Sequence, residues 1–81
     1  MSKTVTFKQL QRTLNEFGFE KSRQKGSHVI FRHSEKGVVV VVPNIGETVR
    51  PVYVKTAARQ IANSGIATVS TFENRLEKTA K

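Results

Sequence analysis

The chain has 81 residues, of which 14 are lysine or arginine and six are glutamate, and its formal charge at pH 7 is +8. A chain of this length forms one small domain that buries about 60% of the surface of the unfolded chain, which excludes a second independent core. It has no cysteine, which excludes disulfides, thiolate catalysis and zinc sites with thiolate ligands.

The excess of positive charge is uneven along the chain. Residues 1–33 hold seven basic and two acidic side chains, whereas residues 66–81 hold three and two. A positive field of this kind favours the binding of polyanions, of which nucleic acid is the commonest. The alternative is that the charge only keeps the protein soluble. The sequence has neither an apolar stretch of about 20 residues, the length that spans a bilayer, nor the apolar segment of a signal peptide. We therefore expect a cytoplasmic protein that is not associated with a membrane.

A first helix is predicted to begin after Thr6 and to end at Gly18. Thr6 can cap the helix and Gln9 can complete a capping box. Glycine suits the left-handed residue that ends a helix. One face of the segment repeats apolar side chains at helical spacing, namely Phe7, Leu10, Leu14 and Phe17.

Three short segments after this helix are predicted to form an antiparallel meander. Residues 19–24 alternate weakly, residues 28–33 are rich in β-branched and aromatic side chains, and residues 38–42 are five consecutive valines. Two short glycine-containing turns separate the segments. Pro43 ends the third strand because proline cannot donate to the ladder of hydrogen bonds.

A second helix is predicted from Pro51 to Gly65, with an apolar stripe on one side. Lys55 and Arg59 lie on its opposite side and form a basic stripe, which is either an ordinary solvated surface or a contact for phosphates. Tyr53, near the start of the helix, can stack on a base or simply pack.

A short third helix is predicted beyond Ile66, where Ser70 and Glu73 repeat the pattern of a capping box. Phe72 and Leu76 share one side of this helix, and we expect them to pack onto the domain. Residues 78–81 are expected to fray.

Together these elements predict an α+β domain of order αβββα, with both helices on one face of a three-stranded antiparallel sheet. We expect this domain to cover residues 1–66 and residues 67–81 to form a C-terminal extension. Strand alternation places residues 28, 30 and 32 on one side of the sheet and residues 29, 31 and 33 on the other. The valines make the uncovered side partly apolar, either because valine favours strands or because a partner docks there.

Four segments resemble the HicA family, the small mRNA interferase toxins of prokaryotic toxin–antitoxin pairs. They are residues 15–20, 23–28 and 30–33 and the valine strand that ends at proline. The resemblance covers roughly residues 6–66 and implies a double-stranded-RNA-binding-domain-like fold and a ribonuclease active on mRNA. It also implies one important histidine, here His28, and inhibition by a HicB-type antitoxin that binds the toxin directly, in a complex that can contain a homo-oligomer.

The chain departs from the family pattern at two places. Many members have a Gly-Thr pair before the second helix, where this chain has Arg50 and Pro51. They often place a histidine or a basic residue after the proline that ends the third strand, where this chain has Asn44.

The residue types around His28 are those that RNA cleavage needs. RNA supplies its own nucleophile, the 2′-hydroxyl, so cleavage needs a proton acceptor, a proton donor and positive charge at the phosphate, and a histidine can take either proton role. Gly26 lets the backbone approach a phosphate, and the hydroxyl of Ser27 can donate to it. On spacing alone His28 is better interpreted as a structural histidine at a strand end, and the resemblance reverses this preference in favour of the catalytic role. Four basic residues are close enough in sequence to crowd His28 across a hairpin, namely Lys21, Arg23, Lys25 and Arg32.

No cofactor is expected, and cleavage is predicted to be independent of metal. The two histidines are predicted to face opposite ways, and the six acidic residues are all glutamates without paired ligand spacing. His33 is therefore interpreted as a turn residue.

Two other functions remain open. One is a non-catalytic RNA-binding module, in which Lys55, Arg59 and the basic run at residues 21–25 contact phosphates. The other is an interaction protein whose uncovered sheet face binds an antitoxin-like partner or a second copy of the chain.

Overall fold

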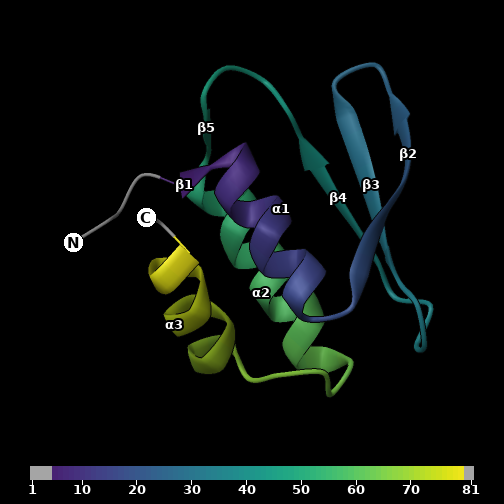
Figure 1. Cartoon of the computed structure of the whole chain (residues 1–81), viewed down its shortest axis with the longest axis vertical. Coiled ribbons are helices and arrows are strands. Elements are labelled where there is room, and N and C mark those ends of the chain that lie inside the picture. The colour runs from purple at the N-terminus through teal and green to yellow at the C-terminus, as the bar shows by residue number, and fades with distance from the viewer. Residues whose placement is uncertain (1–4, 80–81) are drawn as a thin grey trace.

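The structure of the chain is a computed structural model that describes residues 5–79 (Figure 1). The α+β class and the antiparallel meander are confirmed. The elements, in chain order, are β1 (Val5–Thr6), α1 (Phe7–Glu16), β2 (Phe19–Lys25), β3 (His28–His33), β4 (Val39–Pro43), β5 (Thr48–Val49), α2 (Pro51–Asn63) and α3 (Val69–Thr79).

The three main strands form an antiparallel sheet of order β2-β3-β4. Phe31, in the centre, lies opposite Lys21 on β2 and Val40 on β4. A second, two-stranded sheet was not predicted: β1 pairs antiparallel with β5, so that Val5 lies opposite Val49. This pair ties the start of α1 to the segment that leads into α2.

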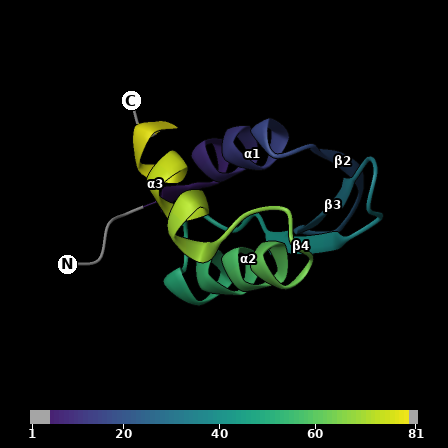
Figure 2. The ribbon, with the colours of Figure 1, turned by 90° about the horizontal axis from the view of Figure 1, so that it is seen from below.

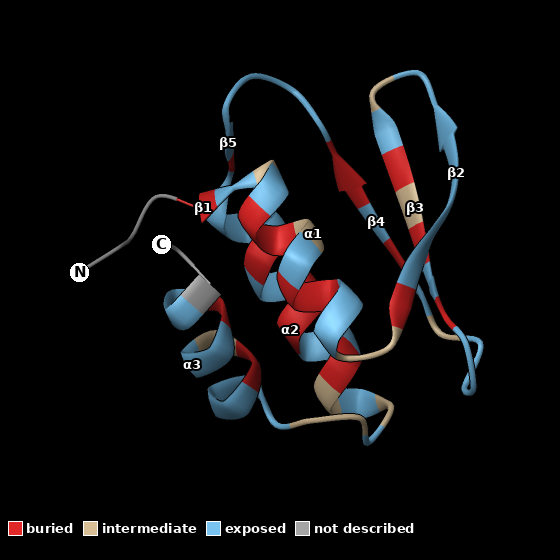
Figure 3. Ribbon diagram, in the orientation of Figure 1, coloured by how far each residue is buried: buried red, intermediate tan, exposed pale blue. Residues whose placement is uncertain are grey.

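The helices form two layers on one face of the main sheet. Both α1 and α2 pack against the sheet, and α3 packs across α1 and α2 on their far side (Figure 2). The core lies between these layers, and its largest fully buried side chains are Phe19, Phe31, Phe72, Leu10, Leu14 and Ile61 (Figure 3). The opposite face of the sheet has no helix over it among the described residues.

The start of α1 has the predicted capping box. The backbone N–H of Gln9 donates to Oγ1 of Thr6 over 3.0 Å, and the N–H of Thr6 donates to Oε1 of Gln9 over 3.4 Å. The helix ends before Gly18, whose φ of +95° is a left-handed value that glycine adopts without strain. Gly18 lies in the short turn that leads from α1 into β2.

The third helix packs as predicted but begins differently. Phe72 and Leu76 are buried against the rest of the core. The prediction that Ser70 caps the helix is wrong, because α3 already begins at Val69 and the hydroxyl of Thr68 accepts the N–H of Thr71 over 3.1 Å. The helix runs to Thr79, so the predicted fraying is wrong for residues 78 and 79, which are helical. Its remaining part, residues 80 and 81, lies outside the described residues.

In the described part of the chain, no helix is both long and apolar enough to cross a membrane.

Candidate functional site

His28 is the first residue of β3 and is exposed. It lies opposite Lys25 on β2 and opposite Pro43 on β4. Residues that lie directly opposite one another in a sheet share a face. Lys25 and His28 therefore project from the face of the sheet that α1 and α2 do not cover, which we call the open face.

Two hydrogen bonds fix the turn before His28, one from β2 and one from the segment after β4. Gly26 has a φ of +62°, and a side chain there would meet nothing within 4 Å. Nε2 of Gln24 donates to the carbonyl of Gly26 over 3.0 Å, and the N–H of Asn44 donates to the carbonyl of Ser27 over 2.6 Å. The turn is thus fixed to the segment after β4, with open space around its glycine.

An irregularity in β2 divides the predicted basic cluster. The register of β2 against β3 shifts between Lys21 and Arg23. A bulge of this kind adds one residue and reverses the side from which the following residues project. Arg23 consequently lies opposite Ile30 on the open face, whereas Lys21 lies opposite Phe31 on the side of the helices.

The far end of the open face holds Arg32, which lies opposite Glu20 and Val39. The structure therefore brings Arg23, Lys25 and Arg32 onto the face of His28. Sequence reasoning missed Glu20, because its place beside Arg32 depends on the strand register.

His33 lies on the opposite side of the sheet from His28, as predicted. Its side chain is buried, and Nδ1 accepts the N–H groups of Glu35 at 3.2 Å and Lys36 at 3.0 Å. The ring also contacts Phe19 edge to face, with 5.1 Å between the ring centroids. This histidine organises the turn between β3 and β4.

Lys55 and Arg59 do not join the open face. Both are exposed on α2, whose buried side chains include Val54 and Ala58 and face the core. Tyr53, 38% exposed, borders a hollow of about 340 Å³ between the end of β4 and the start of α2. The basic stripe therefore lies on a different surface from the open face.

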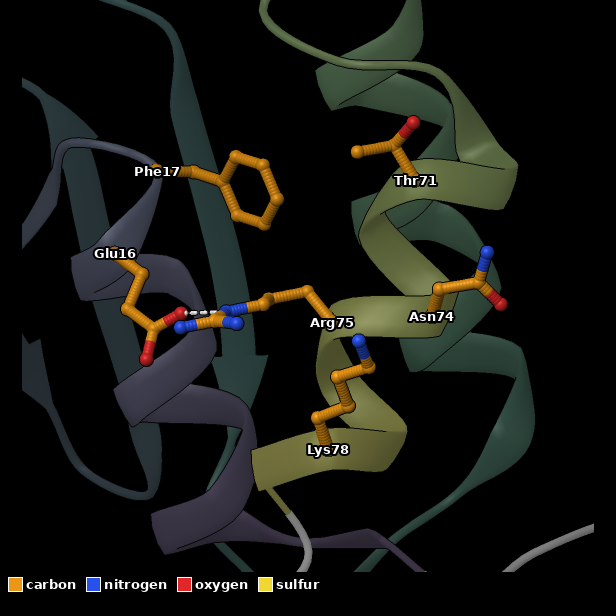
Figure 4. A pocket seen from close by; sticks show the side chains of 6 residues that line it. All are labelled: Glu16, Phe17, Thr71, Asn74, Arg75 and Lys78. Carbon is orange, nitrogen blue, oxygen red and sulfur yellow. Dashed lines mark hydrogen bonds and ion pairs between the residues drawn. The ribbon is translucent and has the colours of Figure 1, made fainter.

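A larger hollow, of about 700 Å³, lies between the end of α1 and α3 (Figure 4). The carboxylate of Glu16 and the guanidinium of Arg75 form an ion pair across it. This hydrogen bond, together with the charge of Glu16, raises the pKa of Arg75. The hollow contains none of the predicted site residues, because α3 lies beyond the helices from the sheet (Figure 2).

Among residues 5–79 the structure has no group of three or more histidine, cysteine, aspartate or glutamate side chains placed to hold a metal ion.

A family model described as the HicA toxin of bacterial toxin–antitoxin systems matches residues 7–62. The chain belongs to the HicA toxin family. The matched region runs from the first residue of α1 almost to the end of α2 and contains all the residues that we predicted for the site. As a HicA toxin, the protein has the toxin role in a toxin–antitoxin pair, and that role implies an antitoxin as its partner.

The matched region ends before α3, so the third helix lies outside the HicA model. Comparisons with curated proteins and with solved structures gave no match.

Proposed function

We propose that this HicA toxin is an endoribonuclease that cleaves mRNA without a metal ion, with His28 as general acid or base. The proposal depends on the contrast between the two histidines. His28 is exposed beside Lys25, whereas His33 is buried with Nδ1 occupied by two backbone N–H groups. Only His28 can reach a bound polymer.

The reaction needs two proton transfers. The 2′-hydroxyl loses its proton and its oxygen attacks the adjacent phosphorus, which forms a 2′,3′-cyclic phosphate. The bond from phosphorus to the 5′-oxygen breaks, and that oxygen takes up a proton and becomes a 5′-hydroxyl. His28 carries one of these protons and solvent water carries the other, a contribution worth about 10²- to 10⁴-fold in rate.

The charges around His28 suit the developing phosphorane. Lys25 lies directly opposite His28, and Arg23 lies one row further along the open face. Gly26 leaves room for a phosphate to approach the backbone of the turn. Fixed positive groups of this kind stabilise negative charge that builds up in a transition state.

The partner and the place of action follow from the proposed substrate. An mRNA substrate implies action in the cytoplasm. A HicB-type antitoxin would inhibit cleavage by keeping RNA away from His28, in a complex that can hold more than one toxin copy. Mass measurement of a complex formed with such an antitoxin would give the number of copies.

The chemistry can be tested with one matched pair of RNA substrates. The first is an RNA that the protein cuts, incubated in EDTA, and the second carries a single 2′-deoxynucleotide on the 5′ side of the cut. We expect the first RNA to yield a 2′,3′-cyclic phosphate by mass spectrometry and the second to stay intact at that position. Cleavage of the deoxy-substituted RNA, or cleavage only with added metal, would overturn the mechanism.

The non-catalytic alternative makes a different prediction. If Lys55 and Arg59 serve only to bind phosphates, binding should be strongly salt-dependent and should not change when His28 is replaced. Stable binding of duplex RNA without cleavage at any pH would favour this function.

A further inference from the structure

The open face has three rows of side chains that run across the strands. His28 lies in the first row and Arg32 in the third, about 13 Å apart along β3. The rows, each read from β2 to β4, are Lys25–His28–Pro43, Arg23–Ile30–Val41 and Glu20–Arg32–Val39.

The two sides of this face differ in chemistry. The β2 side carries Arg23 and Lys25, both exposed, and Arg32 extends this charge into the central strand. The β4 side is apolar, with Val39 and Val41 left 42% and 45% exposed. A positive strip therefore runs beside an apolar strip, and both lead away from His28.

We propose that the open face is a platform for single-stranded RNA, an inference that rests on the proposed function for the identity of the ligand. The backbone of the RNA follows Arg23 and Arg32, and its bases lie over Ile30, Val39 and Val41. His28 lies at one end of the platform, where it meets the phosphate to be cut.

The apolar strip is the reason to prefer a single strand. A duplex presents phosphates and sugar hydroxyls on its outside and keeps the faces of its bases stacked inside. Exposed valines gain nothing against such a surface. A single strand can turn the apolar faces of its bases toward the protein while its phosphates contact basic side chains, as in other proteins that bind single strands.

The charges favour RNA over a protein as the occupant. Among the strand residues of the main sheet, Arg23, Lys25 and Arg32 share this face with one carboxylate, that of Glu20. A polyanion neutralises all three cations, whereas a protein partner would have to supply several carboxylates at matching positions.

The test uses His28→Ala protein, so that binding is measured without cleavage. The probes are fluorescein-labelled hexauridylate and a labelled blunt RNA duplex, followed by fluorescence anisotropy. The variant adds Val39→Thr and Val41→Thr, which replace methyl groups by hydroxyls and suit a strand. The control adds Val69→Thr, a valine of similar exposure (39%) at the start of α3.

We expect the double valine variant to raise the Kd for hexauridylate by about five- to tenfold. The Val69→Thr control should leave the Kd for hexauridylate unchanged. The Kd for the duplex should not change in either variant. An unchanged Kd for hexauridylate would overturn the platform. So would a duplex that binds more tightly than hexauridylate with a Kd that the valine substitutions do not change.

Two further outcomes separate this inference from the proposed function. If wild-type protein fails to cleave RNA but the valine variant loses affinity for hexauridylate, the ribonuclease proposal fails and the platform stands. If the valine variant keeps its affinity for hexauridylate and loses affinity only for its antitoxin, the open face is a protein-docking surface and the platform is wrong.

Discussion

Gln9 and Leu76 are joined by a buried hydrogen bond, in which Nε2 of Gln9 donates to the carbonyl oxygen of Leu76 over 2.9 Å. Oε1 of the same Gln9 side chain accepts the N–H of Thr6 in the capping box of α1. One side chain thus links the start of the first helix to the third, although α3 lies outside the region that the family model matches.

Removal of α3 should therefore destabilise the whole domain. Phe72→Ala should lower the free energy of unfolding by about 3–5 kcal/mol, because this ring is fully buried and packs against Phe17. Truncation after Ala67 should cost more. Urea denaturation measures both effects, with Val69→Ala at an exposed position of α3 as the control. A truncated chain with an unchanged melting temperature would show that α3 is dispensable.

Gly18 is predicted to be intolerant of any side chain. A methyl group at this position would lie 2.7 Å from Nε2 of His33 and would also occupy a left-handed backbone conformation. Gly46 has a similar φ of +76° but nothing within 4 Å. Gly46→Ala should cost about 1–2 kcal/mol from the backbone alone. Gly18→Ala should cost clearly more, and equal losses of stability would contradict the contact with His33.

The two histidines should differ in their effect on stability. His33→Ala should cost about 2–3 kcal/mol, because it removes a buried ring and leaves the N–H groups of Glu35 and Lys36 without their acceptor. His28→Ala should change the free energy of unfolding by less than about 0.5 kcal/mol, since His28 is exposed. Urea denaturation compares the two variants. A large loss of stability in His28→Ala would point to a structural role for His28.

Basic residues on the open face should contribute to RNA binding more than those on α2. Arg32→Gln should raise the KM for RNA cleavage and reduce the slope of log affinity against log salt by about 0.7, the value for one phosphate contact to a single strand. Arg59→Gln is the matched control, because Arg59 is exposed on a different surface. If the control has the larger effect, RNA binds along α2.

Local signals predicted most of the fold correctly. The capping box of Thr6 and Gln9, the glycine that ends α1 and the proline that ends β4 depend on a few neighbouring residues, and the structure has all of them. The pairing of Val5 with Val49 could not be predicted, because strands of two residues have no periodicity.

The sequence does not determine two details: the face from which Lys21 projects and the residue that caps α3. Lys21 is predicted beside His28, but because of the bulge after it, Lys21 lies on the opposite face from Arg23 and Lys25, and no residue type marks a bulge at Ser22. Thr68 and Ser70 are both acceptable caps for α3. In the structure the hydroxyl of Thr68 accepts the N–H of Thr71, and Phe72 is fully buried.

The most direct test of a catalytic role for His28 compares wild-type protein with His28→Ala, at equal concentration in EDTA, on a structured mRNA from pH 5 to pH 8. We predict that only wild type cleaves the RNA and that both proteins are folded and bind it. Equal cleavage by both proteins, or intact RNA bound equally by both, would contradict a catalytic role for His28.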